Sequence, residues 1–279
     1  MMPTTPLCVL TIAGSDSGGG AGIQADLKTF AAHGVHGLSA IAALTAQNTQ
    51  RVTAVHVPPV EFLRAQIDAC FDDFRIGAVK LGMLANADVI HAVADALEFH
   101  APPAIVLDPV MVATSGGKLL ADDAIDALRR RLLPIATLVT PNIPEAEAIL
   151  GRSIADGRAA DDAVARLLGL GVHAVLLKGG HLEEGARVVD RFSDGRAHEK
   201  FLHARLDLQA HGTGCTLASA VAANLCRGQA LDAACRDASD YVSAALRGGY
   251  RPGRADLVVL DHGRNAQAAS SRENKKAGE

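Results

Sequence analysis

The sequence predicts an α/β fold in which a mainly parallel sheet is flanked by helices. Short apolar runs alternate with helical patterns along the 279 residues, of which 49% are hydrophobic. Such an alternation predicts right-handed strand–helix–strand crossovers. The abundance of Ala, Val, Leu and Gly fits helices packed on a parallel sheet that is covered on both faces.

The first elements surround a glycine-rich loop. Residues 7–13 are apolar and predict a strand, and the loop from Gly14 to Gly22 follows them. We expect a helix after this loop to about Ala32 and a second strand near residues 38–45.

The middle of the chain repeats this pattern. Apolar residues recur at helical spacing between residues 60 and 74, which predicts an amphipathic helix there. Four further apolar runs, separated by helical segments, predict strands at residues 76–81, 104–107, 137–139 and 174–177.

The C-terminal third begins with a predicted hairpin. Residues 187–192 and 197–202 flank Asp194-Gly195, a turn sequence that favours an antiparallel pair of strands at a sheet edge. Two helices, expected at residues 213–226 and 230–246, then close the fold.

One domain is expected over residues 1–262, because no repeat or linker-like stretch divides them. Residues 263–279 are polar and poor in apolar side chains, which predicts a disordered tail.

Composition excludes several classes of function. The net charge is −4 and aromatic residues make up 3% with no Trp, so no surface for nucleic acid is indicated. The five cysteines include no CxxC pair, so neither a zinc site nor a disulfide framework is indicated. The chain shows no signal-peptide pattern and no apolar run of transmembrane length. We therefore expect a cytoplasmic protein that contacts no membrane.

The most informative local feature is Gly212-Thr213-Gly214-Cys215, which directly precedes a small-residue run that predicts a buried helix. Backbone N–H groups and the dipole at a helix start attract anions such as phosphate. Cys215 would lie in the first turn, where positive potential lowers the pKa of a thiol. These features indicate phosphoryl transfer. A glycine-rich loop that only begins a packed helix is the alternative, and the tetrapeptide does not decide between them.

Further polar residues follow predicted strands, at the edge where parallel sheets bind ligands. Asp108 ends one strand and could present a carboxylate to Mg²⁺. Asn142 and Glu145 would share one side of a first helical turn, although an Asn and a Glu at this spacing also form a capping box without any ligand. Lys178 ends a later strand and could reach a nucleotide phosphate.

The N-terminal half offers a second set of candidates. The loop from Gly14 to Gly22 permits close backbone approach to a ligand, but the chain contains no Walker-type phosphate loop, and a surface loop without a ligand is the alternative. Gln47 suits a heterocycle with a ring nitrogen and an amino group, or it caps a strand. Met83 could form an apolar wall, although a core position is the more common role. We interpret His181 as a loop residue. The same interpretation is favoured for His211, although its position beside Gly212 keeps it of interest.

The order of these motifs resembles that of the hydroxymethylpyrimidine/phosphomethylpyrimidine kinases of thiamine biosynthesis. The motifs that carry the resemblance are residues 13–26, 47–49, 80–84, 108–111, 140–145, 178–181 and 211–216. Seven motifs in one order are far more specific than any one of them. The resemblance implies the ribokinase-like fold, a three-layer sandwich, in which the pyridoxal kinases are the nearest relatives of this family.

The resemblance also implies a substrate pocket and a catalytic centre. Gln47 would hydrogen-bond the aminopyrimidine. The other residues that would surround the substrate are Gly14, Asp26, Met83 and Val110. The backbone of Gly212, Thr213 and Gly214 would form the anion hole. Cys215 takes the place of the aspartate base of sugar kinases, and we hypothesise that it assists deprotonation without forming a phosphoenzyme.

For the nucleotide, the resemblance implies ATP with Mg²⁺. Asp108 and Glu145 would hold the metal, partly through water, while Asn142, Thr140 and Lys178 would serve the ATP phosphates. The stretch of residues 206–210 departs from the family pattern, in which a threonine is more usual, and this affects the contacts to adenine.

Three functions remain open at this point. The leading one is ATP-dependent phosphorylation of hydroxymethylpyrimidine and of its monophosphate. The second is a pyridoxal-type vitamin kinase on the same scaffold. The third is a catalytically silent pyrimidine-binding regulator, against which the intact Asp108, Glu145 and Cys215 argue. The resemblance also implies a homodimer.

Overall fold

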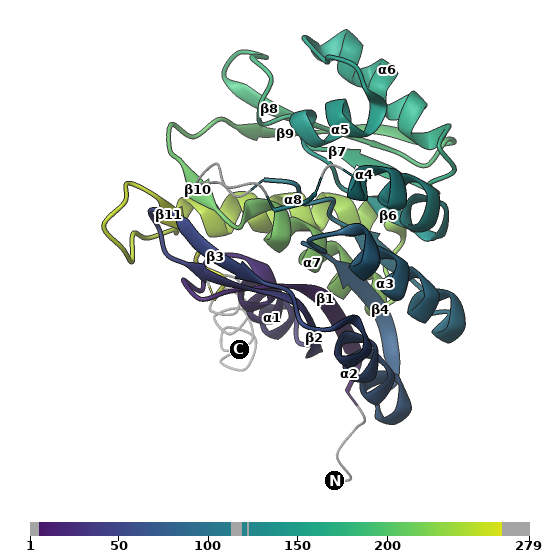
Figure 1. The fold of residues 1–279 in the computed structure, drawn as a ribbon. Helices are drawn as coiled ribbons and strands as arrows, with labels where there is room; N and C mark the ends of the chain where they lie inside the picture. Colours follow the sequence, from purple (N-terminus) through teal and green to yellow (C-terminus); the bar gives the residue numbers. More distant parts are fainter. Residues whose placement is uncertain (1–5, 113–118, 122, 264–279) are drawn as a thin grey trace, which may run out of the picture.

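A nine-stranded sheet forms the centre of the computed structural model, which describes residues 6–112, 119–121 and 123–263 (Figure 1). The strand order is β3-β2-β1-β4-β5-β6-β7-β8-β9. The strands are β1 Cys8–Asp16, β2 His36–Gln47, β3 Val52–His56, β4 Ile76–Leu81, β5 Ile105–Leu107, β6 Leu138–Val139, β7 Val175–Leu177, β8 Arg187–Ser193 and β9 His198–Ala204. The six strands from β2 across to β7 are parallel, whereas β3, β8 and β9 each run antiparallel to a neighbour. The predicted parallel sheet and its edge hairpin, β8–β9, are confirmed.

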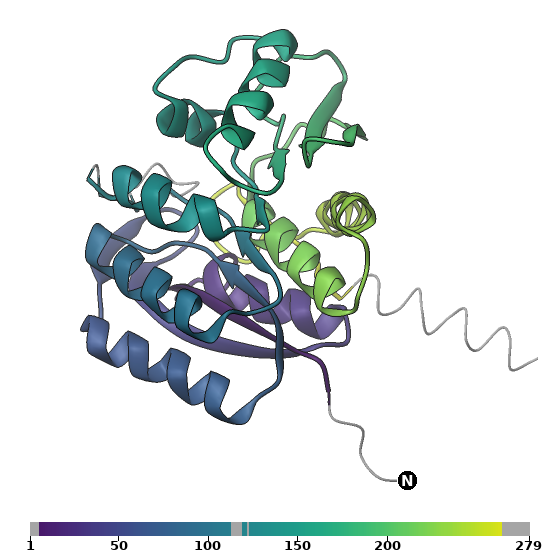
Figure 2. The same cartoon turned by 90° about the vertical axis from the view of Figure 1, so that its right-hand side faces the viewer.

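Helices cover both faces of this sheet, as Figure 2 shows. They are α1 Gly22–Ala32, α2 Val60–Asp73, α3 Ala87–His100, α4 Ala124–Ala127, α5 Ile143–Leu150, α6 Gly157–Leu168, α7 Thr213–Cys226 and α8 Leu231–Arg247, with π and 3-10 turns at Leu128–Leu132 and Leu133–Ile135. Successive strand residues point to opposite faces. Thus Leu10 and Ile12 of β1 join the core under α2 to α6, and Val9 joins the core under α1, α7 and α8.

Helix α7 is half-buried at its start and fully buried along its middle. Residues 216–224 of this helix are all buried, because their small side chains let it pack closely against the sheet, α1 and α8. The predicted bounds of this helix, residues 213–226, agree with the structure.

Some elements differ from the prediction. Strand β1 continues through Gly14 to Asp16, into what was expected to be loop. The edge strand β3 and a second small sheet, formed by β10 Ala210–His211 and β11 Val258–Val259, were not predicted. Except for Gly263, the predicted disordered tail lies outside the described residues. Within the described part of the chain, no helix is both long and apolar enough to cross a bilayer.

The strand order reverses at β1 and β4. From β1 the chain adds β2 and β3 on one side, and β4 then begins the succession of strands on the other side. In open parallel sheets ligands bind beyond the carboxyl ends of the strands at such a reversal. The topology therefore places a site above the ends of β1 and β4.

Candidate active site

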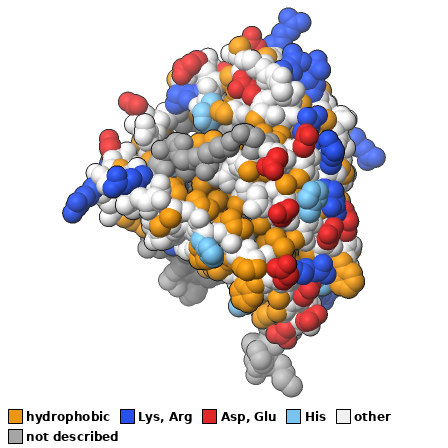
Figure 3. All heavy atoms as spheres, in the orientation of Figure 1, with side chains coloured by type: hydrophobic (Ala, Val, Ile, Leu, Met, Phe, Trp, Pro, Cys, Tyr) orange, Lys and Arg blue, Asp and Glu red, His pale blue; other side chains and the backbone are white. Residues whose placement is uncertain are grey.

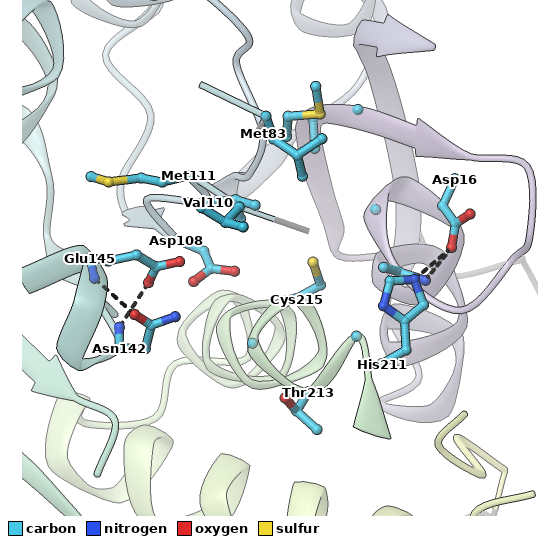
Figure 4. Close-up of a pocket in the computed structure, with 18 of the residues that line it drawn as sticks. Asp16, Met83, Asp108, Val110, Met111, Asn142, Glu145, His211, Thr213 and Cys215 are labelled. Carbon is cyan, nitrogen blue, oxygen red and sulfur yellow. Dashed lines mark hydrogen bonds and ion pairs between the residues drawn. The ribbon is translucent and has the colours of Figure 1, made fainter. Parts of the chain in front are cut away.

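A cavity of about 710 Å³ lies at this position. All the site residues assigned from the sequence line it, with the exceptions of Asp26 and Thr140. In Figure 4, Asp108 and Glu145 lie at one end of the cavity and Asp16 and His211 at the other, with Cys215 between them. The cavity thus has an acidic end, a polar end and a helix start in the middle.

The start of α7 forms the middle of the cavity. Gly212 is its N-cap, with a φ of 79° that favours glycine, and the first intrahelical hydrogen bond joins the Thr216 N–H to the Gly212 carbonyl at 2.9 Å. The N–H groups of Thr213, Gly214 and Cys215 precede that bond, so they are available to an anion. Gly212 also lies against the carbonyl of Gly20, where a Cβ would collide. The glycine-rich loop therefore packs directly on the start of the helix.

The thiol of Cys215 does not have the lowered pKa that a helix start predicts. Burial raises the pKa of Cys215 to about 11, and the nearby Asp26 and Asp108 carboxylates act in the same direction. The Lys80 ammonium and a hydrogen bond from the Gly22 backbone lower this pKa, but they do not outweigh burial. The prediction of a lowered pKa is wrong, because desolvation exceeds the effect of the helix start. At neutral pH the thiol is protonated.

Asp108 and Lys178 form the acidic end together. The Asp108 side chain is 1% exposed, and its Oδ1 accepts hydrogen bonds from Lys178 Nζ at 2.8 Å and from the Thr140 hydroxyl at 3.3 Å. Burial lowers the pKa of Lys178, but Asp108 and Glu145 outweigh burial and raise it. A Cβ on Gly214 would lie 3.0 Å from Lys178 Nζ, so the helix start faces this ion pair.

Thr140 does not line the cavity, which corrects its expected place beside a phosphate. Its side chain is completely buried behind Asp108, to which its hydroxyl donates. The residue is therefore placed to orient the carboxylate.

Asn142 and Glu145 form a capping box and line the cavity as well. Asn142 Oδ1 accepts from the Glu145 N–H at 2.9 Å, and Glu145 Oε2 accepts from the Asn142 N–H at 2.8 Å. The pKa of Glu145 is raised to about 7, because burial and the Asp108 carboxylate, which raise it, outweigh Lys178 and the Asn142 backbone, which lower it. These two hydrogen bonds confirm the alternative that Asn142 and Glu145 form a capping box. It does not exclude binding, because the cap places both side chains at the cavity wall.

The opposite end of the cavity combines a polar amide with an apolar wall. The backbone of Gln47 is held by Ser17, whose hydroxyl lies 2.7 Å from the Gln47 carbonyl and 2.8 Å from its N–H. Met83 packs across β1 and β4, so that a Cβ on Gly14 would lie 2.9 Å from its Sδ. Val110 also lines the cavity, and in Figure 4 it lies between Asp108 and Met83. This end suits a flat heterocycle with polar edge atoms.

Asp26 does not share this wall, and its expected role as a pocket-lining residue is wrong. The side chain is completely buried under the cavity floor, where its carboxylate accepts hydrogen bonds from Thr11 at 2.6 Å and Ser219 at 2.7 Å and contacts Lys80. Lys80, not Asp26, lines the cavity. A buried carboxylate needs such partners, and no local pattern in the sequence indicates them.

Sequence reasoning also missed three residues of the site. Asp16, His181 and His211 all line the cavity, although both histidines were interpreted as loop residues. The position of His211 directly before Gly212 gave a reason for interest, although a loop role was preferred; a residue that enters an anion-binding helix start must lie near the ligand. Asp16 was not predicted as a site residue, because an Asp among Ser and Gly residues is typical of any turn.

The acidic end fits Mg²⁺ bound jointly with a nucleotide. Mg²⁺ usually takes one or two carboxylates together with water and substrate phosphates. Asp108 and Glu145 supply two carboxylates, with Lys178 Nζ 2.8 Å and 3.7 Å from them. Among the described residues, no group of three or more His, Cys, Asp or Glu side chains could hold a metal by itself. The donor set therefore suits a metal that ATP brings with it.

Comparison with known proteins agrees with this geometry. The chain matches the phosphomethylpyrimidine kinase family over residues 16–259. It is 50% identical to the hydroxymethylpyrimidine/phosphomethylpyrimidine kinase of Rhizobium meliloti, over 91% of this chain and 94% of that protein. It is also 49% identical to a thiamine biosynthesis bifunctional protein of Geobacter sulfurreducens. That match covers 86% of this chain but only about half (49%) of the length of the relative.

Solved structures give the same result. Phosphomethylpyrimidine kinase from Clostridium difficile is 40% identical, with a TM-score of 0.76, over 85% of this chain and 97% of that one. An ADP complex of Bacillus subtilis pyridoxal kinase superposes with a TM-score of 0.85 at 32% identity, over 92% of this chain and 98% of that one. With a nucleotide-compatible cavity, a ribokinase-like fold and a family match across most of its length, this chain belongs to the phosphomethylpyrimidine kinase family.

Proposed function

We propose that this protein transfers the γ-phosphoryl group of ATP to 4-amino-5-hydroxymethyl-2-methylpyrimidine and then to its monophosphate. The observation that carries the proposal is the position of the α7 start between two different binding ends. The acidic end holds Asp108 and Lys178 for a metal and a triphosphate, and the other end holds Gln47 for a heterocycle. A phosphoryl group passing between the two substrates would lie at the N–H groups of residues 213–215.

Each set of residues has a defined task in this reaction. Gln47 would hydrogen-bond the aminopyrimidine, with Gly14, Met83 and Val110 packed around the ring. The charged Lys178 would contact a nucleotide phosphate, with Asn142 beside it. Phosphoryl transfer depends mainly on positioning and on stabilising charge. The preformed helix start fits that requirement because its N–H groups need not reorient.

Mg²⁺ would be held by Asp108 and Glu145 and would neutralise charge on the β- and γ-phosphates when bound. Thr140 supports this arrangement through its hydrogen bond to Asp108. Glu145 must lose its proton to serve as a ligand, and its pKa of about 7 makes that possible near neutral pH.

We propose that the thiolate form of Cys215, a minor form at neutral pH, accepts the proton of the substrate hydroxyl during transfer; the thiol must first lose its own proton to solvent. The new phosphate ester bond forms as the O–H bond breaks, so a proton acceptor must lie near the substrate oxygen. Steady-state kinetics of Cys215→Ser and Cys215→Ala test this role. If both variants keep full turnover, the thiol is not the acceptor and only the backbone N–H of residue 215 contributes.

A pyridoxal-type kinase is the second candidate, favoured by the close superposition on the pyridoxal kinase fold. An ADP-release assay with hydroxymethylpyrimidine, its monophosphate and pyridoxal side by side separates the two activities. We expect turnover of both pyrimidines with a much higher kcat/KM than for pyridoxal. Tight pyrimidine binding without ADP release would instead indicate the silent regulator.

We further propose that the protein is a cytoplasmic homodimer. Apolar side chains are exposed at one end of the sheet, on β2, β3 and α2, where Leu44 is 42%, Val55 43% and Phe62 62% exposed. Figure 3 shows hydrophobic side chains gathered over this part of the molecule, as is typical of protein contact surfaces. All five cysteines are free, which fits a reducing compartment. Light scattering on the wild type and on Phe62→Glu tests the dimer.

A further inference from the structure

His211 connects the polar end of the cavity to the start of α7. It is the last residue of β10 and directly precedes Gly212. Its side chain is buried, and its ring packs so closely on Gly20 that a Cβ there would lie 2.7 Å from Cδ2. Its Nε2 lies 3.2 Å from Asp16 Oδ2 and 3.0 Å from the amide atom of Gln47 that the structure assigns as Nε2. One ring nitrogen thus faces a carboxylate and the amide proposed to recognise the substrate.

The Asp16 carboxylate determines whether His211 Nε2 carries a hydrogen. Asp16 Oδ2 accepts N–H groups from Gly20 and Ala21, both at 2.9 Å, and Oδ1 accepts from Gly18 at 2.7 Å. Burial raises the pKa of Asp16, but the hydrogen bonds from His211 and the backbone outweigh it and lower the pKa. An ionised carboxylate only accepts hydrogen bonds. His211 Nε2 must therefore carry a hydrogen, which it shares between Asp16 and Gln47.

That hydrogen in turn determines how the Gln47 amide is oriented. The structure assigns Gln47 Nε2 to the side of His211 and Oε1 to the side of the Thr45 hydroxyl. Because His211 Nε2–H donates, the two amide atoms must be exchanged, so that the acceptor Oε1 lies toward His211. The amide atom on the other side, assigned as Oε1, lies 3.1 Å from the Thr45 hydroxyl, but that hydroxyl also lies 3.0 Å from the Ser15 carbonyl, to which it can donate its one hydrogen. This hydroxyl can accept from an NH₂ group but has no second hydrogen to donate. The opposite orientation would set two donors against each other at His211, and amide orientation is properly assigned from such a network.

We propose that His211, held by Asp16, is a positioning residue that determines substrate specificity by fixing the amide of Gln47. With Oε1 toward His211 and Nε2 toward Thr45, the remaining lone pair and the remaining N–H of Gln47 face the cavity in a fixed order. This order matches a heterocycle edge that pairs an amino N–H with a bare ring nitrogen. It opposes the reversed edge, in which an oxo group stands beside a ring N–H. The inference rests on the proposed function in placing a pyrimidine at Gln47.

Kinetics of His211→Phe and His211→Gln test this role. Phe keeps an aromatic ring over Gly20 without the N–H, and Gln restores a donor. Leaving a buried polar group wrongly paired weakens binding by about tenfold to a hundredfold. For His211→Phe we expect the KM for the aminopyrimidine to rise by about that factor, while the KM for ATP and the kcat change by less than about threefold. The preference for the amino substrate over its oxo analogue should fall by at least about tenfold, and His211→Gln should restore most of both.

Two further measurements keep the outcome decisive. His198→Phe, on the exposed edge strand β9, is the control and should leave all these constants unchanged. A two-bond ¹H–¹⁵N spectrum of the wild-type protein should show His211 protonated at Nε2, and a bare Nε2 would overturn the inference without any variant. The inference would also be overturned if His211→Phe kept the wild-type preference for the amino substrate over its oxo analogue. An equal rise in the KM for ATP and in the KM for the pyrimidine would overturn it too. Failure of the wild type to phosphorylate either pyrimidine would instead reject the proposed function.

Discussion

Lys80 Nζ lies 2.9 Å from Asp26 Oδ2, and both side chains are completely buried. The pair joins β4 to α1 at the floor of the cavity, which Lys80 lines and beneath which Asp26 lies. Burial lowers the pKa of Lys80, but the Asp26 carboxylate and other negative groups outweigh burial and raise it. The ammonium therefore remains charged inside the protein, close to Cys215, whose pKa it lowers.

Removing one member of this pair should destabilise the protein strongly. Lys80→Met leaves the Asp26 carboxylate buried without its cation, which costs about 3–5 kcal/mol. Urea unfolding at neutral pH measures the change in the free energy of unfolding. The double variant Lys80→Met/Asp26→Leu removes both charges and should recover much of the loss. A loss below about 1 kcal/mol in the single variant would mean that water or another group compensates the carboxylate.

The raised pKa of Cys215 predicts slow alkylation at neutral pH. With a pKa of about 11, roughly one thiol in several thousand is ionised at pH 7.5, and only the thiolate reacts. The rate of modification by iodoacetamide should therefore rise about tenfold per pH unit up to about pH 11. Mass spectrometry of the peptide that contains Cys215 measures this rate. Rapid labelling that is constant from pH 7 upward would contradict the burial argument.

Activation by Mg²⁺ should depend on pH through Glu145. Its pKa is raised to about 7, so the carboxylate gains a proton as the pH falls below 7 and loses it above. Because a metal competes with that proton, the apparent Mg²⁺ affinity should fall about tenfold per pH unit below 7. Titration of activity with Mg²⁺ at several pH values, with ATP saturating, measures this. Glu145→Gln should bind Mg²⁺ more weakly and without this pH dependence, and an unchanged dependence would assign it to another group.

The sequence predicted the fold wherever burial imposes a pattern. Strands that are covered on both faces, such as β4 and β7, appear as apolar runs at nearly the observed bounds. Strand β3 was missed because four of its five residues are exposed, so no alternation marks it. Strands β10 and β11 have two residues each, too few for any period to show.

The part of the candidate site that is formed by residues at the ends of parallel strands could be predicted from the sequence. Asp108, Asn142 and Lys178 each follow a strand of one parallel sheet, so their meeting follows from topology. The Lys80–Asp26 pair could not be predicted, because its members are 54 residues apart and only tertiary packing joins them. The sequence also could not give the degree of burial that reverses the expected pKa of Cys215.

Gly212 should be the least replaceable glycine of the site. Gly212→Ala places a Cβ against the Gly20 carbonyl and forces alanine into a left-handed backbone with a φ of 79°. The backbone alone costs about 1–2 kcal/mol, and the collision adds to it and displaces the N–H groups of residues 213–215. We expect a fall in kcat/KM of at least about a hundredfold, as for loss of an anion-hole donor.

Gly228→Ala is the matched control, since its φ is 84° but nothing lies within 4 Å of the added Cβ. It should show only the backbone cost in urea unfolding, with activity retained. Equal stability and equal activity of the two variants would show that the contact with Gly20 does not position the helix start.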